Sequence, residues 1–246
     1  MRKLFVIGIG AGDPDHVTVQ AIKAMNQVDV FFVIGKGAEK QELNDLRARI
    51  LDEHVRGTYR VVEVPDPPRD RTPSDYTATV DDWHDRRADA LRAGFAECDG
   101  VGAVLVWGDP SLYDSTLRIV ERITAQDNSF DYEVIPGITA PQALAARYRI
   151  VLNRIGEPVH ITTGRQLQAD PVGDAVVMLD SNDSFTAVSG DDVHIWWGAY
   201  LGMPDETLIA GRLRDVEDDI VRTRSRLRER KGWIMDTYLL REDGPA

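Results

Sequence analysis

The sequence is short of several residue types, and each shortage narrows the class of protein. Cys98 is the single cysteine among 246 residues, so the chain forms no intramolecular disulfide and no cysteine-based metal site. One unpaired thiol is typical of a reducing compartment, and we expect a cytoplasmic protein. No run of about 18 consecutive apolar residues occurs, so we expect no membrane-spanning helix.

Basic residues are scarce relative to acidic ones. The chain has 29 Lys and Arg against 41 Asp and Glu, a formal net charge of −12. This charge repels nucleic-acid phosphates and anionic membrane surfaces at long range, so we expect neither as a partner. The 5 histidines lack the close spacing of zinc ligands, and we expect no bound metal. Hydrophobic residues make up 43% of the chain, enough for a core in one large or two small domains.

Short β-branched runs alternate with helical patterns in the first half of the chain. This alternation is typical of βαβ units and a mostly parallel sheet. A proline-rich, charged stretch at 65–74 interrupts it and is expected to be a surface loop. We expect strands at 4–7, 30–34, 59–64, 102–107 and 132–135, and helices at 17–27, 41–54 and 80–98.

After about residue 147 the pattern changes to strands with fewer helices between them. The sequence therefore predicts a two-domain α/β protein, with an N-terminal α/β domain over 1–143 and a C-terminal α+β domain over 144–246. The strands expected in the second domain are 160–163, 175–179, 194–199, 207–213 and 233–240.

Three glycine-containing loops directly follow expected strands. They are residues 8–14 (GIGAGDP), 107–116 (WGDPSLYDST) and 136–140 (PGITA). Loops at the carboxyl ends of parallel strands are where such sheets bind ligands, and glycine lets a ligand approach the backbone. Their shared position predicts one composite site.

A Rossmann dinucleotide site is the first alternative for the N-terminal loop. The spacing is G-x-G-x-G-D-P rather than G-x-G-x-x-G, and Asp13 places a carboxylate where a pyrophosphate needs bare N–H groups. The second strand also ends in Ile34-Gly35-Lys36, with no acidic residue for a ribose. The sequence therefore favours a cationic or zwitterionic ligand over a phosphate.

Taken in order, the three loops resemble those of the tetrapyrrole (corrin/porphyrin) methyltransferases, which use S-adenosylmethionine. Segments 152–158 (LNRIGEP) and 162–165 (TTGR) resemble the same family, so the likeness covers nearly the whole chain. It implies a mixed sheet in the second domain, a cofactor cleft between the domains and a homodimer. Carried over by position, the family's cofactor site implies Ala11, Trp107, Gly108, Asp109, Leu112, Thr139, Ala140, Met178 and Gly211.

Three segments outside the shared loops resemble one branch of this family. They are 34–37 (IGKG), 196–206 (WWGAYLGMPDE) and 232–240 (GWIMDTYLL). The resemblance implies methylation of precorrin-5 at ring carbon C1, with an acetyl group lost as acetate. The alternatives are another precorrin methyltransferase, or a non-catalytic nucleotide- or tetrapyrrole-binding module.

The two parts of such a reaction make different demands on the protein. Methyl transfer from a sulfonium chiefly needs placement of the nucleophilic carbon, whereas deacetylation gains from a general base and an oxyanion donor. The candidates on the glycine loops and after the second strand are Asp13, Lys36, Tyr113 and Asp114. Their plain structural alternatives are, in that order, a cap, a solvated turn residue, wall packing and a surface charge.

A tetrapyrrole substrate rich in carboxylates needs basic side chains to receive it, even on an acidic protein. Arginines that alternate between 222 and 230 in a late helix are expected to form a solvated face instead. The basic residues near expected loops and the domain junction are Lys36, Arg147, Arg149, Arg154, Arg165 and Arg212.

Overall fold

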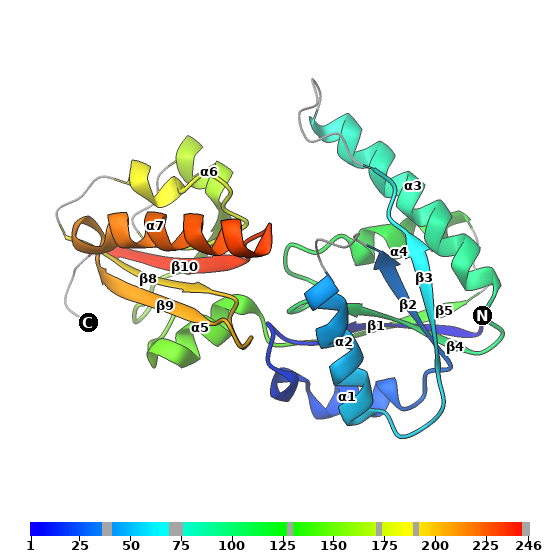
Figure 1. Ribbon diagram of the computed structural model, residues 1–246. Helices are drawn as coiled ribbons and strands as arrows, with labels where there is room; N and C mark the ends of the chain where they lie inside the picture. The colour runs from blue at the N-terminus through cyan, green and yellow to red at the C-terminus, as the bar shows by residue number, and fades with distance from the viewer. Residues whose placement is uncertain (36–40, 69–75, 127–129, 171–173, 189–191, 243–246) are drawn as a thin grey trace. The chain divides into compact units, whose positions relative to one another are not determined.

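The structure is a computed structural model that describes residues 1–35, 41–68, 76–126, 130–170, 174–188 and 192–242 (Figure 1). Contacts between residues divide the chain into two compact units. Unit 1 comprises residues 1–10 and 14–138, and unit 2 comprises residues 11–13 and 139–246. Three residues of the first glycine loop therefore belong to unit 2.

Unit 1 is built on a five-stranded parallel sheet with the order β3-β2-β4-β1-β5. Its strands are β1 (Lys3–Gly8), β2 (Val30–Gly35), β3 (Arg60–Pro65), β4 (Val101–Val106) and β5 (Asp131–Ile135). Its helices are η1 (Pro14–His16), α1 (Val19–Met25), α2 (Gln41–His54), α3 (Tyr76–Ala96) and α4 (Thr116–Gln126). The expected parallel sheet is confirmed, with each strand within about two residues of its predicted bounds.

The central strands β1, β2 and β4 are mostly buried on both faces of this sheet, as continuous apolar strands require, whereas the edge strands β3 and β5 are largely exposed. On β1, Leu4 and Val6 join a core cluster with side chains of α3 and α4. Phe5 and Ile7 point to the opposite face and are also buried, on the side covered by α1 and α2. Residues 66–68 after β3 are irregular, as the prolines predicted, and residues 69–75 lie outside the described part.

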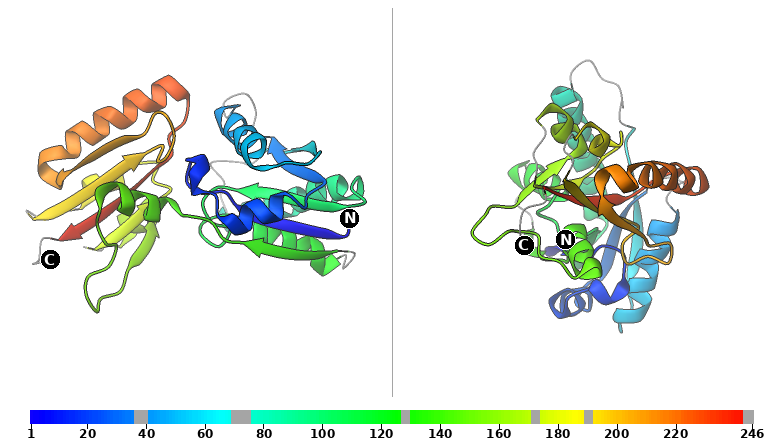
Figure 2. Two further views of the ribbon diagram at one scale, coloured as in Figure 1. Left: turned by 90° about the horizontal axis from the view of Figure 1, so that it is seen from below. Right: turned by 90° about the vertical axis from the view of Figure 1, so that its left-hand side faces the viewer.

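Unit 2 has a mixed sheet with the order β6-β7-β10-β8-β9 (Figure 2). Only the β6–β7 pair is parallel, so the mixed sheet implied by the family resemblance is confirmed. The strands are β6 (His160–Thr163), β7 (Ala175–Met178), β8 (Val193–Ala199), β9 (Thr207–Arg212) and β10 (Asp236–Glu242). The helices are α5 (Ala140–Tyr148), α6 (Gly164–Ala169), η3 (Ser184–Ala187) and α7 (Leu213–Lys231).

The two tryptophans of β8 show how the faces of this sheet differ. Trp196 packs against a cluster that contains Leu144 of α5. Trp197 is fully buried, and its indole Nε1 donates to Asp236 Oδ2 at 2.7 Å on the α7 side. Successive residues of a strand point to opposite faces, so α5 and α7 cover opposite sides of the sheet.

Arg224 of α7 corrects the expectation that the arginines of this helix form a solvated face. Its side chain is 2% exposed. Its Nε donates to Asp236 Oδ2 at 2.7 Å, its Nη1 donates to Asp183, and its Nη2 donates to the Asp180 carbonyl oxygen at 2.5 Å. The expectation was wrong for this residue because the carboxylates that pair with it come from distant parts of the sequence.

The carboxylate of Asp180 extends this buried polar cluster. Its Oδ2 accepts hydrogen bonds from the Tyr238 hydroxyl at 2.8 Å and from the Ser184 N–H at 2.7 Å. Burial raises the pKa of Asp236, while the Arg224 guanidinium and the Trp197 N–H act in the opposite direction. The segment that follows β7 is therefore held to α7 and β10 by charged groups out of water.

Replacing Arg224 by Met is expected to lower the free energy of unfolding by about 3–5 kcal/mol, because the buried Asp236 carboxylate loses its counter-charge. Urea denaturation measures this change. The matched control is Arg226→Met on the same helix, where the side chain is exposed and the change is expected to stay within about 0.5 kcal/mol. Equal effects of the two substitutions would contradict the role of Arg224.

Candidate functional site

The three glycine loops meet at one edge of the unit 1 sheet. They follow β4, β1 and β5, which are neighbours in that order, so their carboxyl ends lie side by side. A Cβ added to Gly137 would lie 2.1 Å from the Gly108 carbonyl oxygen, and one added to Gly8 would lie 2.7 Å from the same oxygen. The loops therefore touch backbone to backbone, at a distance that side chains do not permit.

Asp109 holds two of these loops together. Its Oδ2 accepts the Gly137 N–H at 2.8 Å, and its Oδ1 accepts the N–H and the hydroxyl of Ser111 at 2.8 and 2.5 Å. Partial burial acts to raise the pKa of Asp109, but the hydrogen bonds from Ser111 and Gly137 outweigh it and keep the pKa below its ordinary value. The carboxylate is therefore ionised, and both of its oxygens accept hydrogen bonds from residues of these loops.

The remaining predicted residues of the β4 loop surround this bond. Trp107 and Leu112 are half-buried, and the indole Nε1 of Trp107 is buried with no hydrogen-bond partner among the described residues. Tyr113 is 42% exposed in a left-handed conformation with φ of 53°. Asp114 accepts the Thr116 N–H at 2.6 Å at the start of α4, which is a capping contact.

Two predicted residues of the first loop are part of unit 2. Ala11 is 5% exposed and packs in the core cluster formed with α5. Asp13 Oδ2 lies 3.8 Å from Arg147 Nη2. The Arg147 Nε donates to Glu206 Oε1 at 2.8 Å, and Glu206 Oε2 also accepts the Gly202 N–H at 2.6 Å. Asp13 is thus adjacent to an ion pair that fixes the turn before β9.

Thr139 and Ala140 begin α5. The Gln142 N–H donates to Thr139 Oγ1 at 3.4 Å, while the Thr139 N–H donates to Gln142 Oε1 at 2.9 Å. This capping box starts the helix directly after the PGITA loop. Both predicted residues are half-buried.

Met178 and Gly211 lie far apart in the unit 2 sheet and are not aligned across its strands. Met178 aligns through Thr237 and Gly198 with Leu208 on β9. Gly211 is three residues further along β9, about 10 Å away, and β9 is three strands from β7, about 14 Å across the sheet. The sheet therefore does not bring these two predicted cofactor residues together.

Three of the six basic residues expected to receive a polycarboxylate have acidic partners. Arg154 Nε lies 2.6 Å from Asp174 Oδ2, and Arg212 Nη1 lies 3.8 Å from Asp192 Oδ1. Arg147 pairs with Glu206, as described above. Arg149 adopts a left-handed conformation as the C-cap of α5, and Arg165 is exposed in the first turn of α6. Lys36 lies outside the described residues.

Arg47 of α2 is a cation near the β4 loop that the sequence reasoning missed. Its guanidinium carbon lies 5.5 Å from the centroid of the Trp107 ring. Burial lowers the pKa of Arg47 to about 10, and the charge of Asp114 acts in the opposite direction. The missed signal is a charged residue at an inward position of an amphipathic helix, between the buried Leu43, Leu46 and Ile50.

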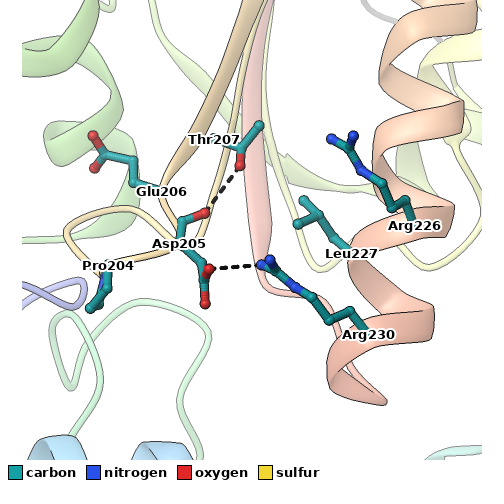
Figure 3. Close-up of a pocket in the computed structure, with 7 residues that line it drawn as sticks. All are labelled: Pro204, Asp205, Glu206, Thr207, Arg226, Leu227 and Arg230. Atoms are coloured by element: carbon teal, nitrogen blue, oxygen red, sulfur yellow. Dashed lines mark hydrogen bonds and ion pairs between the residues drawn. The ribbon is translucent and has the colours of Figure 1, made fainter.

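Unit 2 also carries a cavity of about 450 Å³ beside α7 and the start of β9 (Figure 3). Arg230 Nη2 lies 2.8 Å from Asp205 Oδ1, and Lys231 Nζ lies 2.5 Å from Asp205 Oδ2. The hydrogen bond from Lys231 keeps the pKa of Asp205 below its ordinary value. The lining residues include none of the predicted cofactor residues: Pro204, Asp205, Glu206, Thr207, Arg226, Leu227 and Arg230.

With this arrangement in view, comparison with known proteins gives the class of the molecule. The chain belongs to the tetrapyrrole (corrin/porphyrin) methylases, because the model of that family matches residues 3–217. Among the described residues, no helix is long and apolar enough to cross a membrane, and no group of three or more His, Cys, Asp or Glu is placed to hold a metal ion.

Two individual proteins are similar to this chain over almost its full length. The chain is 49% identical to the precorrin-6A synthase [deacetylating] of Sinorhizobium sp. over 98% of this chain and 96% of that protein. A crystal structure of a protein described as cobalamin synthesis related (CobF), from Corynebacterium diphtheriae, matches with a TM-score of 0.85 and 40% identity, covering 98% of this chain and 99% of that one.

A more distant structure shows the shared fold. The uroporphyrin-III C-methyltransferase of Thermus thermophilus, solved in complex with S-adenosylhomocysteine, has a TM-score of 0.60 and 16% identity. It covers 97% of this chain and 92% of its own. The two-unit α/β architecture is therefore that of the family.

Replacing Asp109 by Asn is expected to lower the free energy of unfolding by about 1–2 kcal/mol near pH 7, because charge-assisted hydrogen bonds are lost. The folded-state pKa of Asp109 lies below its unfolded value, so its stabilisation is complete above the unfolded pKa and disappears as the pH falls through the folded pKa. The gap between wild type and variant should therefore shrink as the pH falls below about 4, the ordinary pKa of an aspartate side chain.

Urea denaturation at several pH values measures this gap. The control is Asp99→Asn, at an exposed residue of the same unit outside the loops, for which we expect a change of at most about 0.5 kcal/mol. A gap for Asp109→Asn that stays constant with pH would show that the carboxylate charge does not hold the loops.

Proposed function

We propose that this protein is an S-adenosylmethionine-dependent C-methyltransferase that converts precorrin-5 to precorrin-6A in cobalamin biosynthesis. It methylates ring carbon C1 and releases acetate. The observation that carries the proposal is the 49% identity to a precorrin-6A synthase over 98% of the chain. The match of the family model supports the reaction class, and the identity supports the branch.

The residues at the glycine loops fit a zwitterionic cofactor. The backbones of Gly8 and Gly137 pack directly on the Gly108 carbonyl and fix the loop, and the neighbouring Trp107 N–H has no acceptor among the described residues. When bound, S-adenosylmethionine supplies an electrophilic methyl group on a sulfonium. The residues proposed to hold it are Ala11, Trp107, Gly108, Asp109, Leu112, Thr139, Ala140, Met178 and Gly211.

Methyl transfer asks mainly for placement of the reacting carbon. Asp109 supports this step as a positioning residue, since both its carboxylate oxygens are bonded to loop N–H and hydroxyl groups. The bare backbone at Gly108 and the half-buried Leu112 then provide a fixed surface for the ligand. Rigid loops lower the entropic cost of bringing the two reactants into line.

Loss of the acetyl group requires a base to activate water and a donor to stabilise the oxyanion. Asp13, Lys36, Tyr113 and Asp114 remain the proposed groups. Asp13 is half-buried, and its Oδ2 lies 3.8 Å from Arg147 Nη2. Tyr113 offers a neutral hydroxyl, because burial raises its pKa above its ordinary value. Asp114 is committed in part to capping α4, which makes it the weaker candidate base.

The proposed partners are a tetrapyrrole substrate and a second copy of the chain, as the family resemblance implies. Another precorrin methyltransferase is the second candidate function. It is favoured by the 32% identity to the precorrin-2 C(20)-methyltransferase of Sinorhizobium sp., which covers 56% of this chain. The precorrin-6A synthase has the larger coverage and identity, so we rank the precorrin-2 type of methyltransferase second.

Incubation with precorrin-5 and methyl-labelled S-adenosylmethionine tests the reaction directly. We expect the label in the tetrapyrrole product and one free acetate for each methyl group transferred. Mass spectrometry of the product and enzymatic assay of acetate measure both. Methylation without acetate would move the assignment to a sibling methyltransferase, and no methylation would remove it.

Replacing Gly137 by Ala is expected to weaken binding of S-adenosylhomocysteine by about 10- to 100-fold, because the new Cβ would force the Gly108 loop away. Isothermal calorimetry measures the affinity, with circular dichroism to check the fold. Gly57→Ala is the control, since that glycine is exposed and a Cβ there meets no atom within 4 Å. Equal affinities of the two variants would argue against the loops as the cofactor site.

A further inference from the structure

Arg47 differs from the other stacked arginine of unit 1. Arg87 lies over the Trp83 ring, 3.9 Å from its centroid, and binds both carboxylate oxygens of Asp66 at 2.7 Å. Arg47 lies over the Trp107 ring, 5.5 Å from its centroid, and has no carboxylate within 4.0 Å among the described residues. Of these two arginines beside tryptophan rings, Arg87 thus has an acidic partner and Arg47 lacks one among the described residues.

The guanidinium of Arg47 has more N–H donors than its described neighbours have acceptors for them. It carries five N–H groups. Among the described residues its single hydrogen bond goes from Nη1 to the neutral Asn44 Oδ1, at 3.2 Å. Asp114 acts on it electrostatically, but the Asp114 carboxylate accepts the Thr116 N–H and makes no ion pair with Arg47. The Arg47 side chain is half-buried, so its remaining donors are partly withdrawn from water, and a bound anion would give them acceptors.

The position of Arg47 places these donors beside the proposed cofactor site. Trp107 directly follows β4 and begins the loop that Asp109 bonds to Gly137. The inward side of α2 is fixed by buried Leu46 and Ile50, so the arginine is held in place before any ligand binds. A pre-positioned guanidinium recognises a carboxylate through two parallel hydrogen bonds.

We infer that Arg47 is a carboxylate-binding residue, which receives a carboxylate of the bound small molecule beside Trp107. The inference rests on the proposed function, which supplies two sources of this group. One is a side-chain carboxylate of the tetrapyrrole, and the other is the amino-acid carboxylate of the cofactor. The shared chemistry is a carboxylate on a planar, partly desolvated guanidinium.

Two titrations of the full-length protein test the site and separate the sources. Tryptophan fluorescence follows binding of a porphyrin with eight carboxylates, and calorimetry follows binding of S-adenosylhomocysteine. Arg47→Gln is expected to weaken one of these two affinities by about 10- to 100-fold, the loss of one charge-assisted contact. Weaker porphyrin binding alone identifies the tetrapyrrole as the source, and weaker S-adenosylhomocysteine binding alone identifies the cofactor.

The matched control is Arg49→Gln, which removes the same charge from an exposed position two residues along α2. It is expected to leave both affinities unchanged. Arg47→Lys keeps the charge without the planar fork, so it should recover part of the lost affinity. Circular dichroism checks that each variant retains its fold.

Arg47→Gln with both affinities equal to those of the wild type would overturn the carboxylate site. So would equal losses in Arg47→Gln and Arg49→Gln, since general charge rather than a placed guanidinium would then explain them. If wild-type protein binds no S-adenosylhomocysteine, the methyltransferase proposal fails instead. The porphyrin titration still reports on Arg47 in that case.

Discussion

The close contact between the loops after β4, β1 and β5 is the constraint on which the candidate site depends. Gly108, Gly137 and Gly8 meet with their backbones so near that a Cβ would overlap a carbonyl oxygen. The contact alone only brings the loops close together. The Asp109 carboxylate also fixes how two of them are oriented, because it accepts the Gly137 N–H. The fixed backbone of the candidate site follows from three glycines and one partly buried carboxylate.

The strands of both units were predictable from the sequence because each pairs an apolar run with a clear break. In the central strands of unit 1 the runs are apolar on both faces, and residues such as Leu4 and Phe5 are buried on opposite sides of the sheet. The order of the strands was not predictable in the same way. Pairing β1 between β4 and β5 depends on contacts far apart in sequence, which a local pattern does not contain.

The loops of the candidate site were predictable as a group, since glycine and the end of a strand occur together three times. Individual roles within them were less so. Asp109 suggested either a helix cap or a ligand contact, and the structure shows in addition a hydrogen bond from the Gly137 N–H, 28 residues away. Met178 and Gly211 came from one family pattern, yet the register of the sheet separates them.

Arginines were the least predictable residues, because their environment is set by partners distant in sequence. Arg224 is buried by Asp236 and by Asp183, 41 residues away, while Arg87 is neutralised by Asp66, 21 residues away. In an acidic chain most arginines find such a partner, so the number of basic residues says little about anion binding. What matters is which guanidinium remains without one.

This resolves the conflict between a net charge of −12 and an anionic substrate. Long-range repulsion is screened within about 10 Å at moderate salt, whereas a carboxylate in contact with a guanidinium in a partly desolvated place interacts strongly. Arg147 forms an ion pair with Glu206, and Arg154 forms one with Asp174. Arg47 faces an aromatic ring and a neutral amide and makes no ion pair with the nearby Asp114, so its charge can still pair with a ligand carboxylate beside Trp107.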